Sequence, residues 1–335
     1  MSDDGQYDVV GIGNAIVDVI SQESEEFVVA QDLNKGAMTL IDDQRAVELY
    51  AAMSPAIETS GGSAANTVSG IASFGGSVAF IGKVRNDQLG AVFEHDIRAV
   101  GVDFEQLPGR DGLPTGRSLI VVTPDAARTM NTFLGISSLL HPDDIDVDMV
   151  RQARVLYCEG YIWDVDITKA AIRKAVDECK AAGNQVSFTL SDSFCVERHH
   201  SEWLELAAGP IDILFGNEEE ISTLYRTDDL DAAIAAVRQD VPIGCITRGP
   251  AGSVIVTADD TIVVEAEPVD EVVDTTGAGD LYASGFLYGH CNGVDLETCG
   301  RLASIAAAEV ISHVGARSAT PLDRLARDAG IVTGT

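Results

Sequence analysis

The sequence predicts an α/β fold in which a mostly parallel central sheet is covered by helices on both faces. Short runs rich in β-branched residues alternate with longer stretches of helical spacing, and this alternation is typical of parallel sheets. The 335 residues are 46% hydrophobic and include 32 glycines and 10 prolines, which suits a large core with many tight turns. Neither an internal repeat nor a Pro- or Ser-rich linker divides the chain, so we expect a single domain over residues 1–335.

The elements of this fold follow from local patterns. Residues 7–13 (YDVVGIG) form an apolar run ending in glycine, which is typical of a buried strand. Small and apolar residues at helical spacing predict a helix over residues 63–74. The same criteria predict strands over residues 77–82, 155–158, 185–190, 211–215 and 243–247, and helices over residues 166–182 and 228–239.

Two segments depart from this alternation, at about residues 25–41 and 102–133. They contain short extended runs and turn signals without a convincing helix. Residues 102–104, 117–123 and 128–133 have the pattern of antiparallel strands. We therefore expect these two segments to form a small β-sheet that projects from the edge of the main sheet as a lid.

The net charge is strongly negative, with 53 acidic residues against 22 basic ones and a formal value of −31. Such a chain repels nucleic acids and anionic membranes, so neither is an expected partner. It contains no run of roughly 18 apolar residues, the length that a membrane span needs. Two explanations of the acidity stay open. One is adaptation to a salty cytoplasm, and the other is the ordinary composition of an acidic protein from a GC-rich genome.

The six cysteines and the first residues bear on cellular location. No two cysteines have Cys-x-x-Cys spacing, so no metal or redox pair is expected. The N-terminus is acidic and polar, unlike a secretory signal. We therefore expect free thiols and a cytoplasmic protein.

The most informative motif is Asp-Thr-Thr-Gly-Ala-Gly-Asp at residues 274–280, directly before a stretch of helical spacing. Its glycines allow a turn that directs successive N–H groups into one space as the helix begins, and such a helix start stabilises negative charge. We expect this charge to develop on a phosphoryl group in transfer. Asp280 would accept the proton of the attacking hydroxyl as general base. The backbone N–H groups of Gly277, Ala278 and Gly279 are the ones expected to bind this anion. Thr275, in the same loop, is expected to bind the phosphoryl donor.

A second glycine motif opens the helix predicted over residues 63–74. Gly61 and Gly62 are adjacent and allow a ligand to approach the main chain closely. Asn66, one helical turn further on, is placed to reach a hydroxyl of a polyol. A turn followed by a helix cap would explain the same residues without a ligand.

Together the two motifs resemble those of the ribokinase-like, PfkB-type carbohydrate kinases. Asn217 and Glu220 (NEEE) are similar to that family's Asn-x-x-Glu motif, which organises Mg²⁺ and phosphates through water. Thr247, Gly249 and Gly252 are similar to the glycine-containing stretch that borders its ATP site. The resemblance implies a three-layer α/β/α fold with a small β-sheet lid, and ATP- and Mg²⁺-dependent phosphorylation of a hydroxymethyl group.

Within this family the chain is most similar to adenosine kinases. The segment with Asn14 and Asp18 matches theirs, and the resemblance implies that Asp18 binds the vicinal hydroxyls of the substrate. A carboxylate suits this role because it accepts from two adjacent hydroxyls. Arg128 matches the lid arginine that approaches the phosphates on closure. Tyr161 and Trp163 lie where adenosine kinases place aromatic residues that stack on the base.

Other interpretations remain open. Residues 63–66 (SAAN) are closer to the sugar kinases, and the lid strand lacks an Ala-rich stretch, so a kinase of ribose, fructose or a related sugar is the alternative. A catalytically inactive nucleoside-binding protein is another.

The resemblance also bears on three further features. It implies a monovalent cation such as K⁺ near Asp274 and residues 315–318, and a helix over residues 302–311 beside the adenine of ATP. The protein would be a monomer or a homodimer.

Overall fold

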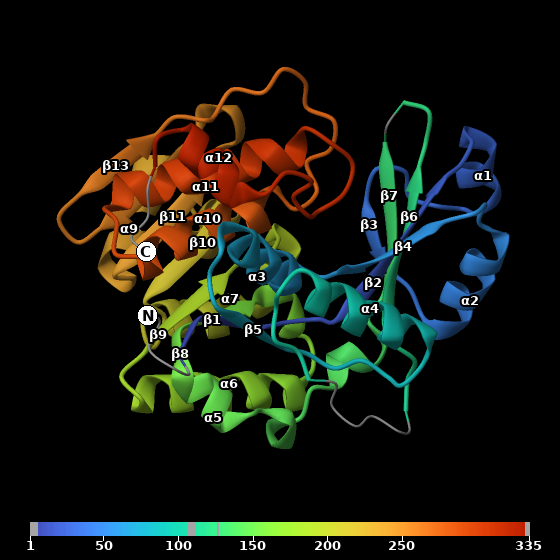
Figure 1. Cartoon of the computed structure of the whole chain (residues 1–335), viewed down its shortest axis with the longest axis horizontal. Helices are drawn as coiled ribbons and strands as arrows, with labels where there is room; N and C mark the ends of the chain where they lie inside the picture. The colour runs from blue at the N-terminus through green and yellow to red at the C-terminus, as the bar shows by residue number, and fades with distance from the viewer. Residues whose placement is uncertain (1–5, 106–111, 126, 332–335) are drawn as a thin grey trace.

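Two β-sheets organise the chain, which the computed structural model describes over residues 6–105, 112–125 and 127–331 (Figure 1). The larger sheet has eight strands in the order β13-β12-β11-β10-β9-β8-β1-β5. Its strands are parallel from β11 to β5, whereas β12 and β13 are antiparallel to their neighbours. The mostly parallel sheet is therefore confirmed. The strands are β1 (Tyr7–Ile12), β5 (Val78–Ile81), β8 (Ala153–Glu159), β9 (Gln185–Thr189), β10 (Ile213–Asn217), β11 (Ile243–Thr247), β12 (Ser253–Thr257) and β13 (Thr261–Val264).

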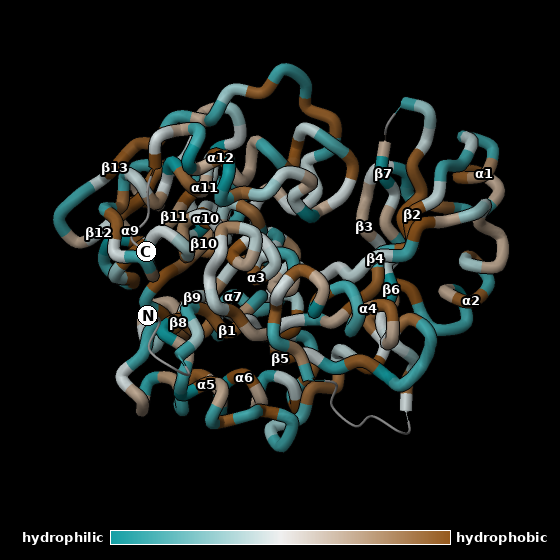
Figure 2. The backbone as a smooth tube through the Cα atoms, viewed as in Figure 1, coloured by the Kyte–Doolittle hydropathy of each residue, from teal (hydrophilic) through white to brown (hydrophobic). Residues whose placement is uncertain are grey.

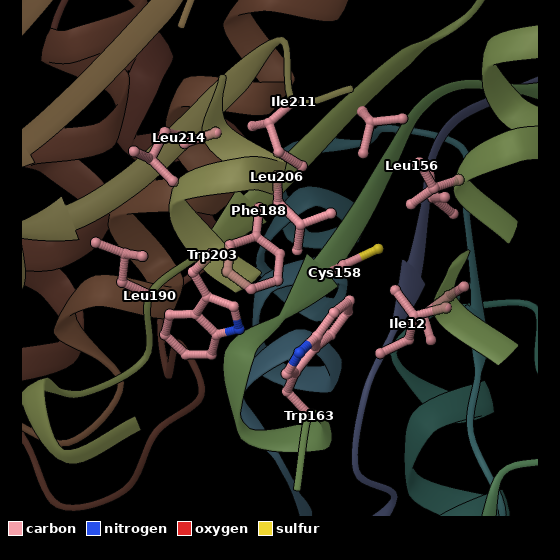
Figure 3. Close-up of a cluster of buried hydrophobic side chains, with 14 of the residues drawn as sticks. Ile12, Leu156, Cys158, Trp163, Phe188, Leu190, Trp203, Leu206, Ile211 and Leu214 are labelled. Carbon is pink, nitrogen blue, oxygen red and sulfur yellow. The ribbon is translucent and has the colours of Figure 1, made fainter. Parts of the chain in front are cut away.

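Alternation along the central strands separates two hydrophobic cores. Successive side chains of a strand point to opposite faces of the sheet. Val10 and Leu156 are buried in the core shown in part in Figure 3, whereas their neighbours Val9 and Val155 are buried in the core on the other face. Both faces are thus apolar, and each is covered by helices. This confirms the three-layer arrangement.

The helices divide between the two faces of the large sheet. One face packs against α5 to α9, and the other packs against α3, α4, α10 and α11, with α12 beside them. Within the described ranges, no helix is both long and apolar enough to span a membrane. The helices are α3 (Ser63–Phe74), α4 (Gln88–Ala99), α5 (Val147–Gln152), α6 (Asp166–Ala181), α7 (Ser193–Ala207), α8 (Glu218–Tyr225), α9 (Leu230–Asp240), α10 (Ala278–Cys291), α11 (Leu296–Ile311) and α12 (Leu322–Asp328).

The smaller sheet has five strands in the order β3-β7-β6-β2-β4 and lies to one side of the main body (Figure 1 and Figure 2). Leu119 on one of its faces is buried with Ala46 and Leu49 of the covering helix α2, while Asp18 and Ser118 on the other face line a cleft. Its elements are β2 (Ile16–Gln22), α1 (Glu25–Ala30), β3 (Met38–Leu40), α2 (Asp43–Ala52), β4 (Ile57–Gly61), β6 (Gly116–Val122) and β7 (Arg128–Phe133).

The structure corrects part of the expected lid. Strand β7 has the predicted bounds, and β6 lies one residue before them. Residues 25–30, for which no helix is predicted, form α1, whose start is capped by Ser24 Oγ accepting from Phe27 N at 3.3 Å. The helix has six residues, which is too short to produce a periodic hydrophobic pattern. Its two acidic residues indicate a helix start only if Ser24 is already recognised as the cap.

A second correction concerns the membership of the small sheet. Residues 102–104 are not one of its strands, because Asp103 forms an isolated bridge with Ala79 at the edge of the large sheet. Strands β2 and β4 belong to the small sheet, although only the flanking segments are predicted to form it. Pairing between strands far apart in sequence decides this membership, and local patterns do not report it. Residues 106–111, within the predicted lid, lie outside the described residues.

All six cysteines are buried as free thiols, as the sequence predicts. They pack as small apolar side chains, and Cys158 is part of the cluster in Figure 3. Burial raises the pKa of the Cys158 thiol, which keeps it protonated and unreactive.

The buried Trp203 gives a test of this core. Its ring is 1% exposed and packs against Phe188 with ring centroids 5.2 Å apart (Figure 3). Trp203→Ala should lower the free energy of unfolding by about 3–5 kcal/mol, because it leaves a large cavity. Urea unfolding measures the change. The control Val29→Ala, at a side chain that is 79% exposed, should change it by less than about 0.5 kcal/mol, and equal effects would contradict the packing.

Candidate active site

A cleft of about 1410 Å³ lies between the two sheets, and most of the predicted site residues line it. Its floor contains residues from the carboxyl ends of β8, β9, β10 and β11, the edge at which open α/β sheets bind ligands. The small sheet forms the opposite wall. The predicted residues that line the cleft are Asn14, Asp18, Gly62, Asn66, Tyr161, Asn217, Glu220, Thr247, Gly249, Gly252, Thr275, Gly277, Ala278, Gly279 and Asp280.

Asp280 lies in the first turn of α10, and both of its carboxylate oxygens accept hydrogen bonds from α3. Ser63 Oγ donates to Oδ1 at 2.6 Å, and Asn66 Nδ2 donates to Oδ2 at 3.0 Å. Burial raises the pKa of Asp280 above its ordinary value, while these two bonds and the charge of Arg317 oppose the rise. The carboxylate is therefore held in one orientation in a partly desolvated cleft, which suits a proton acceptor.

The loop before α10 reverses sharply at Gly277. This residue caps the helix with φ +79°, and a Cβ there would lie 2.9 Å from the backbone of Ala316, so a larger residue is excluded. Ala278 N donates to Thr275 O at 3.2 Å, so this N–H, one of the groups predicted to bind the anion, already has an acceptor within the loop. The N–H of Gly279 belongs to the first turn, where helix geometry provides no acceptor within the helix.

Arg128, on the small sheet, contacts the same loop. Its Nη1 donates to Asp274 Oδ2, which ties β7 to the segment before α10 across 146 residues of sequence. Asp274 is buried and also accepts from Gly315 N at 2.9 Å and from Thr276 N at 3.0 Å. The small sheet is therefore linked to the glycine loop by an ion pair. Asp274 is thus charge-paired with a guanidinium, and the monovalent cation expected near it and residues 315–318 stays a prediction.

On the acceptor side of the cleft, Asp18 projects from β2 beside Gly61. A Cβ at Gly61 would lie 2.6 Å from the Asp18 carboxylate, so this glycine allows the close approach of β4. Burial raises the pKa of Asp18 to about 6, and the charges of Arg128 and Arg317 oppose the rise. Asp18 faces the cleft from the small sheet.

Asn14 lies between β1 and β2 and is held by a buried carboxylate that the sequence does not single out. Glu159 Oε1 accepts from Asn14 N at 2.8 Å and Asn14 Nδ2 at 3.0 Å, while Oε2 accepts from Ala64 N at 2.7 Å. Ser137 Oγ donates to Asn14 Oδ1 at 2.9 Å. Glu159 therefore joins the end of β8 to the connection between the sheets and to the start of α3.

The two aromatic residues predicted to stack on a base have different positions. Tyr161 lines the cleft, and its hydroxyl donates to Ser191 O at 3.1 Å. Trp163 is fully buried in the core of Figure 3, where its ring packs edge-on against Phe188. Trp163 is therefore not available to a ligand, and its assignment as a stacking residue is wrong. Local sequence does not show which of two aromatic residues points inward.

Phe194 is an aromatic residue of the cleft that sequence reasoning missed as a binding residue. It lies in the first turn of α7, lines the cleft and is 75% exposed. The small sheet contributes apolar side chains to the same cleft, among them Met38 and Leu40, which are 40% and 49% exposed. The cleft therefore offers apolar surface to a flat group. An exposed phenylalanine in a polar segment is the signal that would have pointed to it.

Asn217 and Glu220 form a reciprocal cap at the start of α8. Asn217 Oδ1 accepts from Glu220 N at 2.8 Å, and the Glu220 carboxylate accepts from Asn217 N and Nδ2 at 3.0 and 2.6 Å. Burial raises the pKa of Glu220 to about 7, and the nearby carboxylates of Asp192, Glu219 and Asp280 add to the rise.

This acidic end of the cleft fits Mg²⁺ held through water. Oxygen donors and uncompensated negative charge suit that ion, which commonly keeps several of its waters. Within the residues the structure describes, no group of three or more His, Cys, Asp or Glu side chains is arranged to hold a metal ion directly. Glu220 and Asn217 are the residues that would hold it indirectly.

The remaining lining extends the cleft along the glycine-containing stretch after β11. Thr247, Gly249 and Gly252 border it together with Ser304, Ala307, Ala308 and Ile311 of α11. Small residues on this helix leave a shallow surface on which a flat ring can lie. The expectation that residues 302–311 flank the adenine of ATP stays a prediction.

A helix start beside a hydrogen-bonded carboxylate, in a cleft between two sheets, is the arrangement that the sequence motifs predict for a phosphotransferase of the ribokinase-like α/β class. Residues 10–323 match the family model described as pfkB family carbohydrate kinase, and the chain belongs to this family. It is a phosphotransferase that acts on an alcohol group, and the family implies ATP as phosphate donor.

Three similar proteins place the chain within this family. An adenosine kinase from Sinorhizobium meliloti has 48% sequence identity and a TM-score of 0.91, covering 97% of this chain and 100% of its own. A probable sugar kinase from Rhizobium etli CFN 42 has 46% identity and a TM-score of 0.92, covering 98% and 99%. A 5-dehydro-2-deoxygluconokinase from Shouchella clausii is 28% identical over 94% of this chain and 93% of its own.

The buried Glu159 predicts a pH dependence of stability. Burial raises the pKa of Glu159 to about 7, above its ordinary 4.5. Between these values the folded protein holds a proton that the unfolded chain has lost, so the free energy of unfolding falls as the pH rises through this window. Glu159→Gln should make the fall shallower by up to about 1.4 kcal/mol per pH unit.

Urea unfolding at a series of pH values from 4.5 to 7.5 measures this slope. The matched control is Glu205→Gln, at an exposed position of α7, which should leave the slope as in the wild type. A slope that is identical in the wild type and in Glu159→Gln would contradict the assignment.

Proposed function

We propose that the protein transfers the γ-phosphoryl group of ATP to the 5′-hydroxyl of adenosine or a closely related nucleoside. The observation that carries the proposal is that one cleft is lined by all the groups this reaction needs. Asp280 and the start of α10 are the groups we assign to the reacting centre, Asp18 is the one we assign to the acceptor, and Tyr161 and Phe194 line the same cleft with the apolar lid residues. A nucleoside presents a hydroxymethyl group, a vicinal diol and a flat base.

The chemistry assigned to the reacting centre is a direct displacement. The 5′-hydroxyl attacks the γ-phosphorus of ATP, its proton passes to Asp280, and the bond between the γ-phosphorus and the oxygen bridging it to ADP breaks. Negative charge on the transferred group is stabilised by the start of α10, with Gly279 N–H as a donor. The hydrogen bonds from Ser63 and Asn66 direct the Asp280 carboxylate toward one position.

Two further groups act on the phosphates. Mg²⁺, held through water by Glu220 and Asn217, would neutralise charge on the ATP phosphates. Arg128 is bonded to Asp274 beside the glycine loop, and on closure of the small sheet its guanidinium would approach the phosphates. Closure of the small sheet would exclude water, which otherwise competes with the substrate hydroxyl for the phosphoryl group.

Adenosine is preferred as acceptor on two grounds. The adenosine kinase of Sinorhizobium meliloti is similar over 97% of this chain, and the exposed ring of Phe194 offers a face on which a base can stack. Aromatic stacking contributes about 1–3 kcal/mol per base. Asp18 would bind the vicinal hydroxyls of the ribose.

A sugar kinase of the same family is the second candidate. It is favoured by the likeness to a probable sugar kinase and by the Ser63 to Asn66 segment, which is closer to the sugar kinases. An inactive nucleoside-binding protein is a third, which the retained Asp280, Asn217 and Glu220 disfavour.

Asp280→Asn tests the phosphotransferase mechanism. The amide cannot accept the proton, so turnover should fall by about 10²–10⁴-fold while the affinity for the acceptor is kept. ADP release measures turnover, and calorimetric titration measures binding. Unchanged turnover would reject Asp280 as the base. Binding without turnover in the wild type as well would support the inactive binding protein.

A panel of acceptors tests the substrate class. ADP release is measured with Mg²⁺ and K⁺ for adenosine, inosine, guanosine, cytidine, ribose, fructose and 2-keto-3-deoxygluconate, and adenosine should have the highest kcat/KM. Phe194→Ala should raise the KM for adenosine by about tenfold, as expected for a lost stacking contact. Val263→Ala, at an exposed position of β13, is the matched control. The highest kcat/KM with a free sugar would favour the sugar kinase.

A further inference from the structure

Arg317 is a basic residue that reaches the reacting centre from outside the recognised motifs. It lies between α11 and α12, and its side chain extends to α3. Its Nε donates to Asn66 Oδ1 at 2.9 Å, and its Nη1 donates to Ser69 Oγ at 2.6 Å. Nη2 is also buried and has no hydrogen-bond partner among the residues that the structure describes. The guanidinium is therefore held rigidly against α3.

The contact with Arg317 decides how the Asn66 side chain is oriented. A guanidinium has only donors, so it requires the amide oxygen of Asn66 to face it. The amide nitrogen must then face the other way, where it donates to Asp280 Oδ2. With the amide reversed, Arg317 would meet a donor and Asp280 would meet an acceptor, and both contacts would be lost.

Arg317 also supplies positive charge where the cleft is rich in carboxylates. The charged groups that face it are Asp18 of β2, Asp96 of α4 and Asp280 of α10. Arg128 is the other guanidinium that acts on Asp18, and it is bonded directly to Asp274. Arg317 has no such direct bond to a carboxylate among the described residues, so its field acts on several of them at once.

We infer that Arg317 is a positioning residue of the phosphoryl-transfer site, which fixes the amide of Asn66 so that its nitrogen faces Asp280. The inference rests on the proposed role of Asp280 as proton acceptor. Arg317 acts through Asn66 by hydrogen bonds and on Asp280 by charge, and it does not touch the reacting atoms. Its charge holds the pKa of Asp280 lower than burial alone would set it.

Arg317→Met tests the inference, because methionine retains much of the side-chain length and removes both the donors and the charge. The kcat with the best acceptor should fall by about 10- to 100-fold, as expected when a reacting group is misplaced. The acidic limb of the kcat–pH profile should move to higher pH by roughly one unit, since a carboxylate that loses a nearby cation holds its proton more tightly. Arg317→Lys keeps the charge, so its acidic limb should lie close to that of the wild type. Its kcat should stay below the wild-type value, because lysine lacks the guanidinium that orients Asn66.

Two controls separate this role from a merely structural one. Arg301→Met removes an exposed arginine of α11 and should change neither kcat nor the pH profile. In an Asn66→Ala background, Arg317→Met should reduce kcat much less than in the wild type, because the amide that it orients is gone. Additive losses of kcat, or a loss of stability without a shift of the acidic limb, would overturn the inference.

A carboxyl ¹³C NMR titration makes the test independent of turnover. The Asp280 signal is assigned by its absence in Asp280→Asn, and its titration midpoint should lie at higher pH in Arg317→Met than in the wild type. If the wild-type protein phosphorylates no acceptor but this shift occurs, the proposed function fails and the coupling of Arg317 to Asp280 stands. If turnover is normal and the midpoint does not move, the inference about Arg317 fails by itself.

Discussion

The close packing of α3 against α10 is the constraint on which the rest of the site depends. Gly70 of α3 lies so close to α10 that a Cβ there would meet Ser284 Oγ at 2.4 Å. This approach brings the starts of the two helices together, so that Ser63 and Asn66 reach Asp280 across more than 200 residues of sequence. The two glycine-containing motifs are therefore brought together at one place in the cleft, where we propose that the phosphoryl transfer occurs.

Charge explains why so many hydrogen bonds converge on the cleft. The protein carries a formal net charge of −31, yet it collects carboxylates in a partly desolvated space. Burial raises the pKa of Asp18, Glu159 and Glu220, and each shift reflects the cost of holding a charge away from water. Backbone N–H groups and the guanidiniums of Arg128 and Arg317 oppose this cost. A bound magnesium ion would add positive charge to this cleft.

The parts of the fold that could be predicted are those encoded by local pattern. Strand β7 has its predicted bounds, because the turns and extended runs that define it are short-range signals. Trp163 could not be assigned correctly, since Tyr161 and Trp163 lie two residues apart on a short turn and the sequence does not show which of them faces the cleft. Phe194 was missed as a binding residue, and Arg317 was named only within the segment expected near a monovalent cation, because their contacts are with partners on other elements. Such partners are brought together only by the packing of the whole chain.

The sequence by itself determined the class of fold and singled out Asp280 and the glycine loop before it, because strand and helix periodicity and a seven-residue motif are local properties. Tertiary structure decided the rest. It placed β2 and β4 in the small sheet, paired Arg128 with Asp274, and used Glu159 to join three segments at one buried point. These features depend on contacts between residues distant in sequence, whose energies arise only when the two sheets and their helices have packed.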